Sequence, residues 1–199
     1  MVGVAMPGIK LVGDSALEWW WQTLTMNRLY CYVGPQTILA ASRSSKPGAI
    51  IKSQADLRAW LEAHWTESDD DGSLTATFVV GKDGHLRLAS RRSEHVACAS
   101  GLPVLTAGEI SFLRNGEVTG VSNHSTGFCP EPESWPFCAA ALDQLGVIHP
   151  MGLTTAVIFR LCPRCKERNV VKDNWFTCEI CGAELPANWN FQNAEHSGE

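Results

Sequence analysis

The residues best suited to chemistry in this sequence are four cysteines near its C-terminal end. They form two Cys-x-x-Cys pairs, Cys162 with Cys165 and Cys178 with Cys181, and twelve residues separate the pairs. Each pair can form a tight knuckle that directs both sulfurs at one ion, and the spacer can hold two short strands that bring the knuckles together. The spacing therefore predicts a zinc ribbon over residues 161–187, with Zn²⁺ bound by all four thiolates.

A ribbon of this kind uses its metal for structure. Four sulfurs fill the tetrahedral shell of zinc and leave no position for a reactive water, so we expect a structural ion and no catalysis by the metal. Gly182 follows the second pair, where a knuckle favours a positive φ. Two alternatives use the same cysteines, namely a pair of disulfides and a redox Cys-x-x-Cys, although a redox motif usually occurs once, beside a βαβ pattern.

A second group of reactive side chains lies between residues 93 and 130. His95 and Glu109 could line a cleft as a general base or as groups that bind a ribose. A nucleophilic cysteine beside a histidine is another option, either Cys98 with His95 or Cys129 with His124. If residues 95–98 are a strand, His95 and Cys98 point to opposite faces, which weakens the first of these pairs.

Two further interpretations of the same segment remain open. His124, Cys129 and Cys138 could bind a second metal ion, although their spacing contains no knuckle. Alternatively, the polar residues fix loops between strands, a role that suits Asn123 and Ser125 because such side chains bond to nearby backbone.

The elements that would position these residues follow from capping signals and hydrophobic periodicity. Ser15 and Glu18 form a capping box for a helix over 16–27, which carries adjacent tryptophans at 19–21. A second helix begins near Ser53, because apolar residues recur there at helical spacing. An acidic, turn-rich stretch follows this helix and is typical of a solvated linker.

Beyond this linker the period changes to two, which indicates strands. The β-rich runs cover 74–80, 85–89, 104–113 and 117–122. A helix capped by Ser134, with Pro136 in its first turn and Gly146 at its end, would pack on these strands. A last strand over 154–160 leads into the first knuckle.

We therefore expect an α+β chain with N-terminal helices, a central antiparallel β-meander with one packed helix, and a C-terminal four-cysteine zinc ribbon. The predicted divisions are a helical region at 1–71, an α+β core at 72–160, the ribbon at 161–187 and a polar tail at 188–199. We expect this tail to fray.

Composition restricts the function. The 199 residues are 45% hydrophobic and 19% charged, which suits a packed globule. The formal net charge of −5, with five basic against six acidic residues between 160 and 199, argues against nucleic-acid binding because phosphate contacts need clustered Lys and Arg. We expect no secretion signal and no membrane span. Zinc knuckles and free thiols suit a reducing compartment, the bacterial or archaeal cytoplasm.

One stretch has a family resemblance. His95, then Gly101-Leu102-Pro103-Val104, Ala107-Gly108-Glu109, Asn115-Gly116, Asn123-x-Ser125 and Pro130 follow one another before a helix that ends in Leu145-Gly146. Over residues 76–148 this order resembles a domain at the C-termini of some bacterial polymorphic toxins, and plant calmodulin-binding IQ-motif proteins carry a similar stretch. That domain has His-Ser-Ser where this chain has His95-Val96-Ala97, so the resemblance implies a β-rich fold more than an activity.

These observations lead to two main functional hypotheses. The first is a cytosolic zinc-binding module for protein interaction or assembly, with a protein partner, no membrane and no nucleic acid. The alternative, which the resemblance implies, is a toxin-type transferase that handles a nucleotide or NAD and uses His95 and Glu109.

Overall fold

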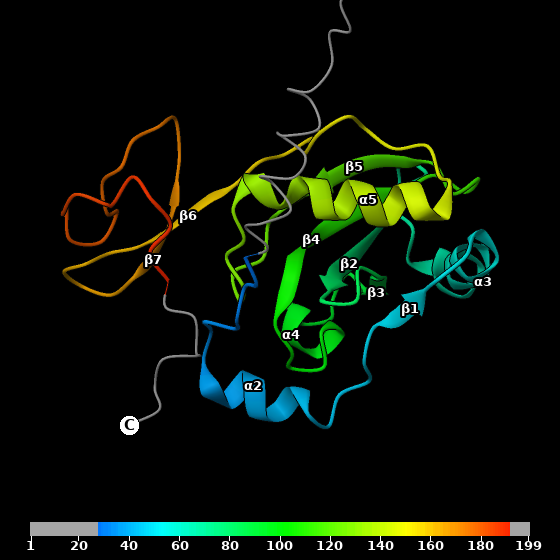
Figure 1. Ribbon diagram of the computed structural model, residues 1–199, viewed down its shortest axis with the longest axis horizontal. Helices are drawn as coiled ribbons and strands as arrows, with labels where there is room; N and C mark the ends of the chain where they lie inside the picture. Colours follow the sequence, from blue (N-terminus) through cyan, green and yellow to red (C-terminus); the bar gives the residue numbers. More distant parts are fainter. Residues whose placement is uncertain (1–27, 192–199) are drawn as a thin grey trace, which may run out of the picture.

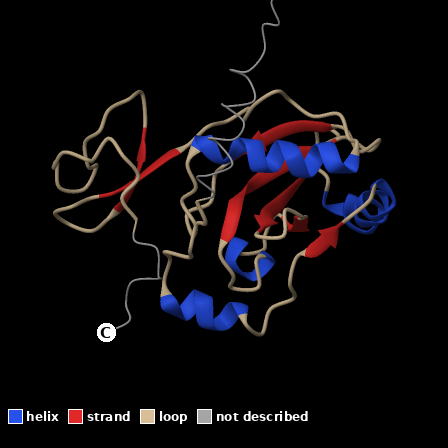
Figure 2. Ribbon diagram, in the orientation of Figure 1, coloured by secondary structure: helices blue, strands red, loops and turns tan. Residues whose placement is uncertain are grey.

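The computed structural model describes residues 28–191. It has an α+β fold in which helices pack against both faces of an antiparallel sheet, and a smaller two-stranded unit projects to one side (Figures 1 and 2). The expected helix over 16–27 and the tryptophans at 19–21 lie outside the described residues.

The main sheet has five strands in the order β1-β3-β2-β4-β5, and every neighbouring pair is antiparallel. The strands are β1 (Ala49–Ile51), β2 (Leu74–Gly81), β3 (Leu86–Ser90), β4 (Val104–Phe112) and β5 (Val118–Ser122). The four β-rich runs of the sequence match the last four strands within one or two residues. The order is not that of an uninterrupted meander, because β4 pairs with β2 and not with β3.

A short helix, α4 (His95–Cys98), lies in the crossover between β3 and β4. The segment is therefore not a strand, and the opposite-face argument for His95 and Cys98 does not apply. Val96 and Cys98 of α4 are buried in one cluster with Val79 and Ala107, on one face of the sheet, together with Phe128. The helix α2 (Gln36–Ser42) packs behind α4 through Ile38 and Leu39 (Figure 1).

The opposite face of the sheet forms the main core. Alternate residues of β2 and β4 point to this side, as strand geometry requires, and they include Phe78, Ile110 and Phe112. Two helices cover them, α3 (Gln54–His64) and α5 (Trp135–Leu145). Because β1 and α3 join this sheet and this core, residues 49–64 pack as one body with the strands that follow them.

The ends of the two long helices lie largely where the sequence predicted them. The Asp56 amide donates to the Ser53 hydroxyl at 3.1 Å, so Ser53 caps α3. Gly146 ends α5 with φ of 63°. Ser134 occupies the N-cap position of α5, as predicted, but its side chain makes no capping bond and instead lies 2.9 Å from the Thr106 hydroxyl. Two 3-10 turns, η1 (Trp65–Glu67) and η2 (Pro132–Ser134), adjoin the long helices.

The projecting unit contains β6 (Ile158–Leu161) and β7 (Arg168–Val171), which form an antiparallel pair. The predicted strand over 154–160 begins later than expected. Residues 154–157 instead run beside β5, where the Thr154 amide donates to the Val121 carbonyl at 2.9 Å and Thr155 bridges Ser122 in parallel. The chain thus passes from the main sheet directly into the cysteine-bearing unit.

Candidate functional site

The four predicted cysteine ligands come together at the end of the projecting unit. All four sulfurs lie within 4.8 Å of one another, and the Cys162–Cys181 and Cys165–Cys178 Sγ–Sγ distances are both 3.6 Å. A Zn–S bond of about 2.3 Å in a tetrahedral site requires sulfurs about 3.8 Å apart. The arrangement therefore fits a metal ion of zinc size at its centre.

The two knuckles have the same backbone geometry. In each, the amide four residues after the first cysteine donates to that cysteine's carbonyl, at 3.0 Å for Lys166 and 2.9 Å for Gly182. The amides of Cys162 and Cys178 each donate, at 2.8 Å, to the carbonyl five residues onward. The two halves thus present their sulfurs in equivalent ways.

The turn in each knuckle requires left-handed backbone at one position. Gly182 has φ of 68°, as the sequence predicted, and Lys166 has φ of 62° at the equivalent position. Glycine adopts this conformation without strain, whereas a lysine does so at a cost. The first knuckle is therefore the more strained of the two.

Backbone amides favour the thiolate form of two ligands. Amides, with that of Cys165 foremost, lower the pKa of Cys162. Burial opposes ionisation of Cys178, but the amides of Cys181 and Ile180 and the neighbouring thiols outweigh it and lower its pKa to about 6. The Glu167 amide acts to lower the pKa of Cys165, but burial and the neighbouring thiols outweigh it and raise this pKa to about 12. Because a thiolate is the form that binds a metal, the surroundings of Cys162 and Cys178 favour a bound cation, and Cys165 would lose its proton to the metal.

The projecting unit, called the ribbon from here on, has a small hydrophobic core. Apart from Cys162 and Cys178, its buried members are Val171 and Leu185, with Phe176 partly buried beside them. So few apolar side chains supply little stabilisation, and domains of this size usually depend on a metal or on disulfides. All eight cysteines are unpaired in this structure, so the disulfide alternative receives no support.

A buried ion pair fixes the ribbon to the body. Arg160 of β6 binds the Glu131 carboxylate through two bonds of 2.7 and 3.3 Å, and their side chains are 5% and 14% exposed. The same guanidinium donates to the Pro186 and Ala187 carbonyls at 3.1 and 2.7 Å. Arg160 thus joins a loop of the body, the base of the ribbon and the segment that leaves it.

The segment after the ribbon returns to the body. Asn190 accepts from the Leu161 amide at 2.9 Å and donates to the Leu161 carbonyl at 2.6 Å. The Trp189 indole donates to the Cys129 carbonyl at 2.8 Å, and Phe191 is buried against Phe159. The expectation that the chain frays from residue 188 is therefore wrong for residues 188–191, because two aromatic residues anchor them.

The other candidate pair, His95 and Glu109, does not line one common pocket. The His95 Nε2 atom lies 3.0 Å from the Gly108 carbonyl, and burial lowers the pKa of His95 while Glu109 opposes this shift. Glu109 lines a pocket of about 300 Å³ together with Arg91 and His124, and the residues lining that pocket do not include His95.

The remaining cysteines lie in the interior. Burial raises the pKa of Cys98 and of Cys129 to about 12, and it raises the pKa of Cys138 further. A nucleophilic cysteine needs a lowered pKa, so these environments oppose the Cys–His hypotheses. Within residues 28–191, the four ribbon cysteines are the only group of metal-binding side chains close enough to share an ion, and the predicted second metal site is not formed.

Asn123 has the structural role that the sequence suggested as an alternative. Its side-chain amide donates to the Pro130 and Val157 carbonyls at 2.8 and 2.7 Å, and its oxygen accepts from the Val157 amide at 2.7 Å. The fully buried side chain thereby joins the loop after β5 to the chain entering the ribbon.

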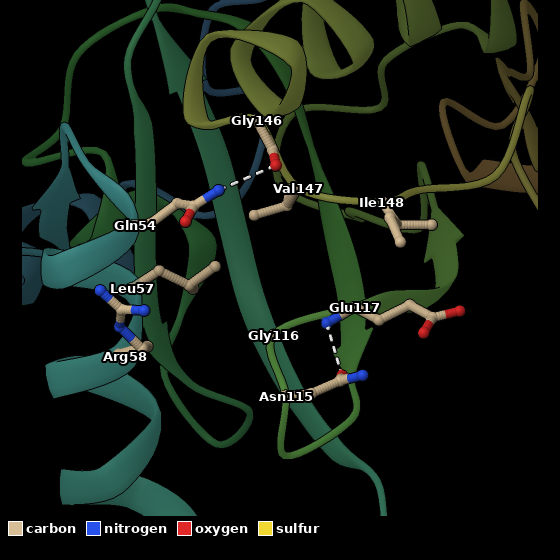
Figure 3. Close-up of a pocket in the computed structure, with 9 residues that line it drawn as sticks. All are labelled: Gln54, Leu57, Arg58, Asn115, Gly116, Glu117, Gly146, Val147 and Ile148. Carbon is tan, nitrogen blue, oxygen red and sulfur yellow. Dashed lines mark hydrogen bonds between the residues drawn. The ribbon is translucent and has the colours of Figure 1, made fainter.

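A smaller hollow of about 180 Å³ lies between the start of α3, the β4–β5 turn and the loop after α5 (Figure 3). Gln54 reaches across it and donates to the Gly146 carbonyl at 2.9 Å. Figure 3 shows that its charged side chains, Arg58 and Glu117, point away from one another. The charged groups that line this hollow therefore do not point toward a common ligand position.

Sequence reasoning missed Arg160, Trp189 and Asn190. A charged residue inside the apolar run Ile158–Leu161 is the one signal that could have indicated a buried partner, since such charges are paired when buried. Trp189 and Asn190 act through contacts distant in sequence, which no local pattern marks.

Comparisons with protein-family models, with curated proteins and with solved structures found no match. The resemblance of residues 76–148 to a polymorphic-toxin domain therefore stays a prediction. Within the described part of the chain, no helix has the length and apolar character needed to cross a membrane.

Proposed function

We propose that this chain is a zinc-stabilised module for protein interaction, in which the ribbon presents apolar side chains to a protein partner. The four-sulfur cluster supports a structural role for the metal, because a tetrahedral site of four thiolates leaves no position for a substrate or a reactive water. Zn²⁺ would be held by Cys162, Cys165, Cys178 and Cys181. When bound, it would supply the cohesion that the small ribbon core lacks.

The observation that carries the proposal is the exposure of two large apolar side chains on the ribbon. Trp175 is 72% exposed in the turn after β7, and Ile180 is 71% exposed between the cysteines of the second knuckle. Interface anchors are enriched in tryptophan, and a partner gains most from residues that a rigid support holds in place. The metal and the Arg160 ion pair would provide that support.

Charge favours a protein partner over a nucleic acid. On the ribbon, exposed acidic residues offset the exposed basic ones: Glu167, Asp173, Glu179 and Glu184 against Arg164, Lys166 and Lys172. The net charge of the chain is −5. Phosphate binding needs a basic surface without such compensation. The reducing cytoplasm, where thiols remain free for zinc, would be the compartment of this module.

The test is affinity capture from the source organism with zinc-loaded protein, followed by measurement of affinity for the protein recovered. We expect a Trp175→Ser, Ile180→Ser double variant to lose the partner while it retains its zinc. Leu102→Ser is the matched control, because Leu102 is 62% exposed but lies on the body. Equal capture by the double variant and the wild type would contradict the proposal.

The alternative of a transferase that uses His95 and Glu109 has less support. The His95 imidazole is held against a backbone carbonyl and does not line the pocket that contains Glu109. A working acid–base pair needs both groups within reach of one substrate. We therefore retain the interaction module as the proposed function.

A further inference from the structure

One part of the sheet surface is both uncovered and polar. Cross-strand neighbours share a face, and the register aligns Thr75 with Ser111 and Gly120, and Thr77 with Glu109 and Ser122. The same face is covered by α4 only at its other end, around Val79 and Ala107. The hydroxyl residues Thr75, Ser111 and Ser122 line the pocket of about 300 Å³ named above together with Glu109, whereas Thr77 is buried outside it. We call this the sheet-face pocket.

Other elements build the walls of the sheet-face pocket. Thr154, Thr155 and Val157 come from the segment entering the ribbon, and Val170 comes from β7 of the ribbon itself. His124 lies at its rim, with its ring parallel to that of buried Phe159 (interplanar angle 8°, centroids 6.0 Å apart). The pocket thus lies where the body and the ribbon meet, and the ribbon completes it.

Glu109 is the group in this pocket with unused bonding capacity. Its side chain is 32% exposed, and among residues 28–191 no hydrogen bond reaches its carboxylate. The nearest cation is the Arg91 Nε atom at 3.6 Å, which is beyond hydrogen-bond distance. Its acceptor oxygens therefore remain available to a ligand.

The charges indicate the class of ligand. Arg91 faces two carboxylates, Glu109 at 3.6 Å and Asp69 at 3.7 Å. Its charge is therefore already compensated, and the two carboxylates disfavour a further anion. The remaining groups are hydroxyls, the Glu109 carboxylate, which accepts no hydrogen bond from the described residues, and one exposed imidazole. A carboxylate can accept from two adjacent hydroxyl groups at once, and a pocket near 300 Å³ suits a small molecule.

We propose that the sheet-face pocket binds a small uncharged molecule through a vicinal diol, with the Glu109 carboxylate accepting from both hydroxyls. The diol can belong to a free sugar or to the ribose of a nucleoside. In a nucleoside, the base would lie against the His124 ring. This site is separate from the proposed docking residues Trp175 and Ile180, so either proposal can fail without the other.

The experiment is an NMR titration of the zinc-loaded full chain, in which the amide signals of Ser122 and His124 are followed. The probes are adenosine, 2′-deoxyadenosine and methyl β-ribofuranoside at millimolar concentration. We expect adenosine to bind about tenfold more tightly than 2′-deoxyadenosine, since a lost hydrogen bond to a charged group has at least this effect. Equal binding of the riboside and adenosine would identify a free sugar as the source of the diol, and a stronger response to adenosine would identify a nucleoside.

Two variants and a control complete the test. Glu109→Gln keeps the shape of the side chain and should weaken binding of the better probe about tenfold. Gly120→Val should abolish binding, because a Cβ at Gly120 meets Ser111 and Thr154 at an ordinary 3.4–3.7 Å and the added methyl groups would occupy the pocket. Glu117→Gln, outside the pocket, should change nothing. The proposal is overturned if neither diol binds, or if Glu109→Gln binds as the wild type does.

Discussion

The ion pair between Arg160 and Glu131 gives the sharpest prediction about how the ribbon is held. Replacement of Arg160 by methionine keeps the apolar length of the side chain but removes the charge. Glu131, only 14% exposed, would then lose both bonds of its carboxylate, and the Pro186 and Ala187 carbonyls would lose their donor. Removal of one partner from a buried pair costs about 3–5 kcal/mol, because the other charge remains buried and unpaired.

The assay is urea unfolding of zinc-loaded protein, followed by circular dichroism. We expect Arg160→Met to lower the free energy of unfolding by about 3–5 kcal/mol. Arg164→Met is the matched control, since Arg164 is exposed, and it should stay within about 0.5 kcal/mol of the wild type. The double variant Arg160→Met, Glu131→Leu should recover at least about 1 kcal/mol of the loss, because no carboxylate then remains unpaired.

A loss below about 1 kcal/mol for Arg160→Met would refute this reasoning, since it is the size expected of an exposed ion pair. Additive effects of the two substitutions in the double variant would refute it as well. Either result would mean that the ribbon is fixed by its aromatic contacts and not by the ion pair.

Three further predictions follow from single positions. Lys166→Gly should stabilise the zinc-loaded ribbon by roughly 1 kcal/mol and Gly182→Ala should destabilise it by a similar amount, because both positions have positive φ. Thermal unfolding measures both effects, and changes in melting temperature of the same sign would contradict the account. Asn123→Ala should lower the free energy of unfolding by about 2–4 kcal/mol, since it leaves buried carbonyls and an amide without partners. A change below about 1 kcal/mol, measured by urea unfolding, would count against this prediction. Zinc uptake by metal-free protein should weaken as the pH falls, most steeply below about 6, where Cys178 with its lowered pKa regains a proton. A colorimetric zinc indicator measures this uptake, and an uptake independent of pH between about 5 and 7 would contradict the prediction.

The sequence was most informative where structure is local. The spacing of the four cysteines defines two turns that need no distant contact, so it predicted the cluster and the positive φ of Gly182. The period of two identified β2, β3, β4 and β5 within one or two residues. The end of α5 at Gly146 followed from the same kind of local signal.

Short elements and distant contacts were not predictable in this way. The helix α4 has four residues and α2 has seven, and neither has a side-chain cap, so each lacks the periodicity and the end signal that mark a helix. The place of β2 between β3 and β4 depends on tertiary packing, which a strand pattern does not encode. The contact between Arg160 and Glu131 joins residues 29 apart in sequence, and the separation of His95 from the pocket of Glu109 results from the turn into α4.

The most direct test of the account is the metal content of the purified chain, measured by mass spectrometry before and after treatment with a chelator. The account predicts one tightly held zinc per chain, a sharp loss of this zinc in a Cys178→Ser variant, and loss of ordered amide signals from residues 158–185 after chelation. A substoichiometric zinc content, or a ribbon that keeps its dispersed signals without metal, would contradict it.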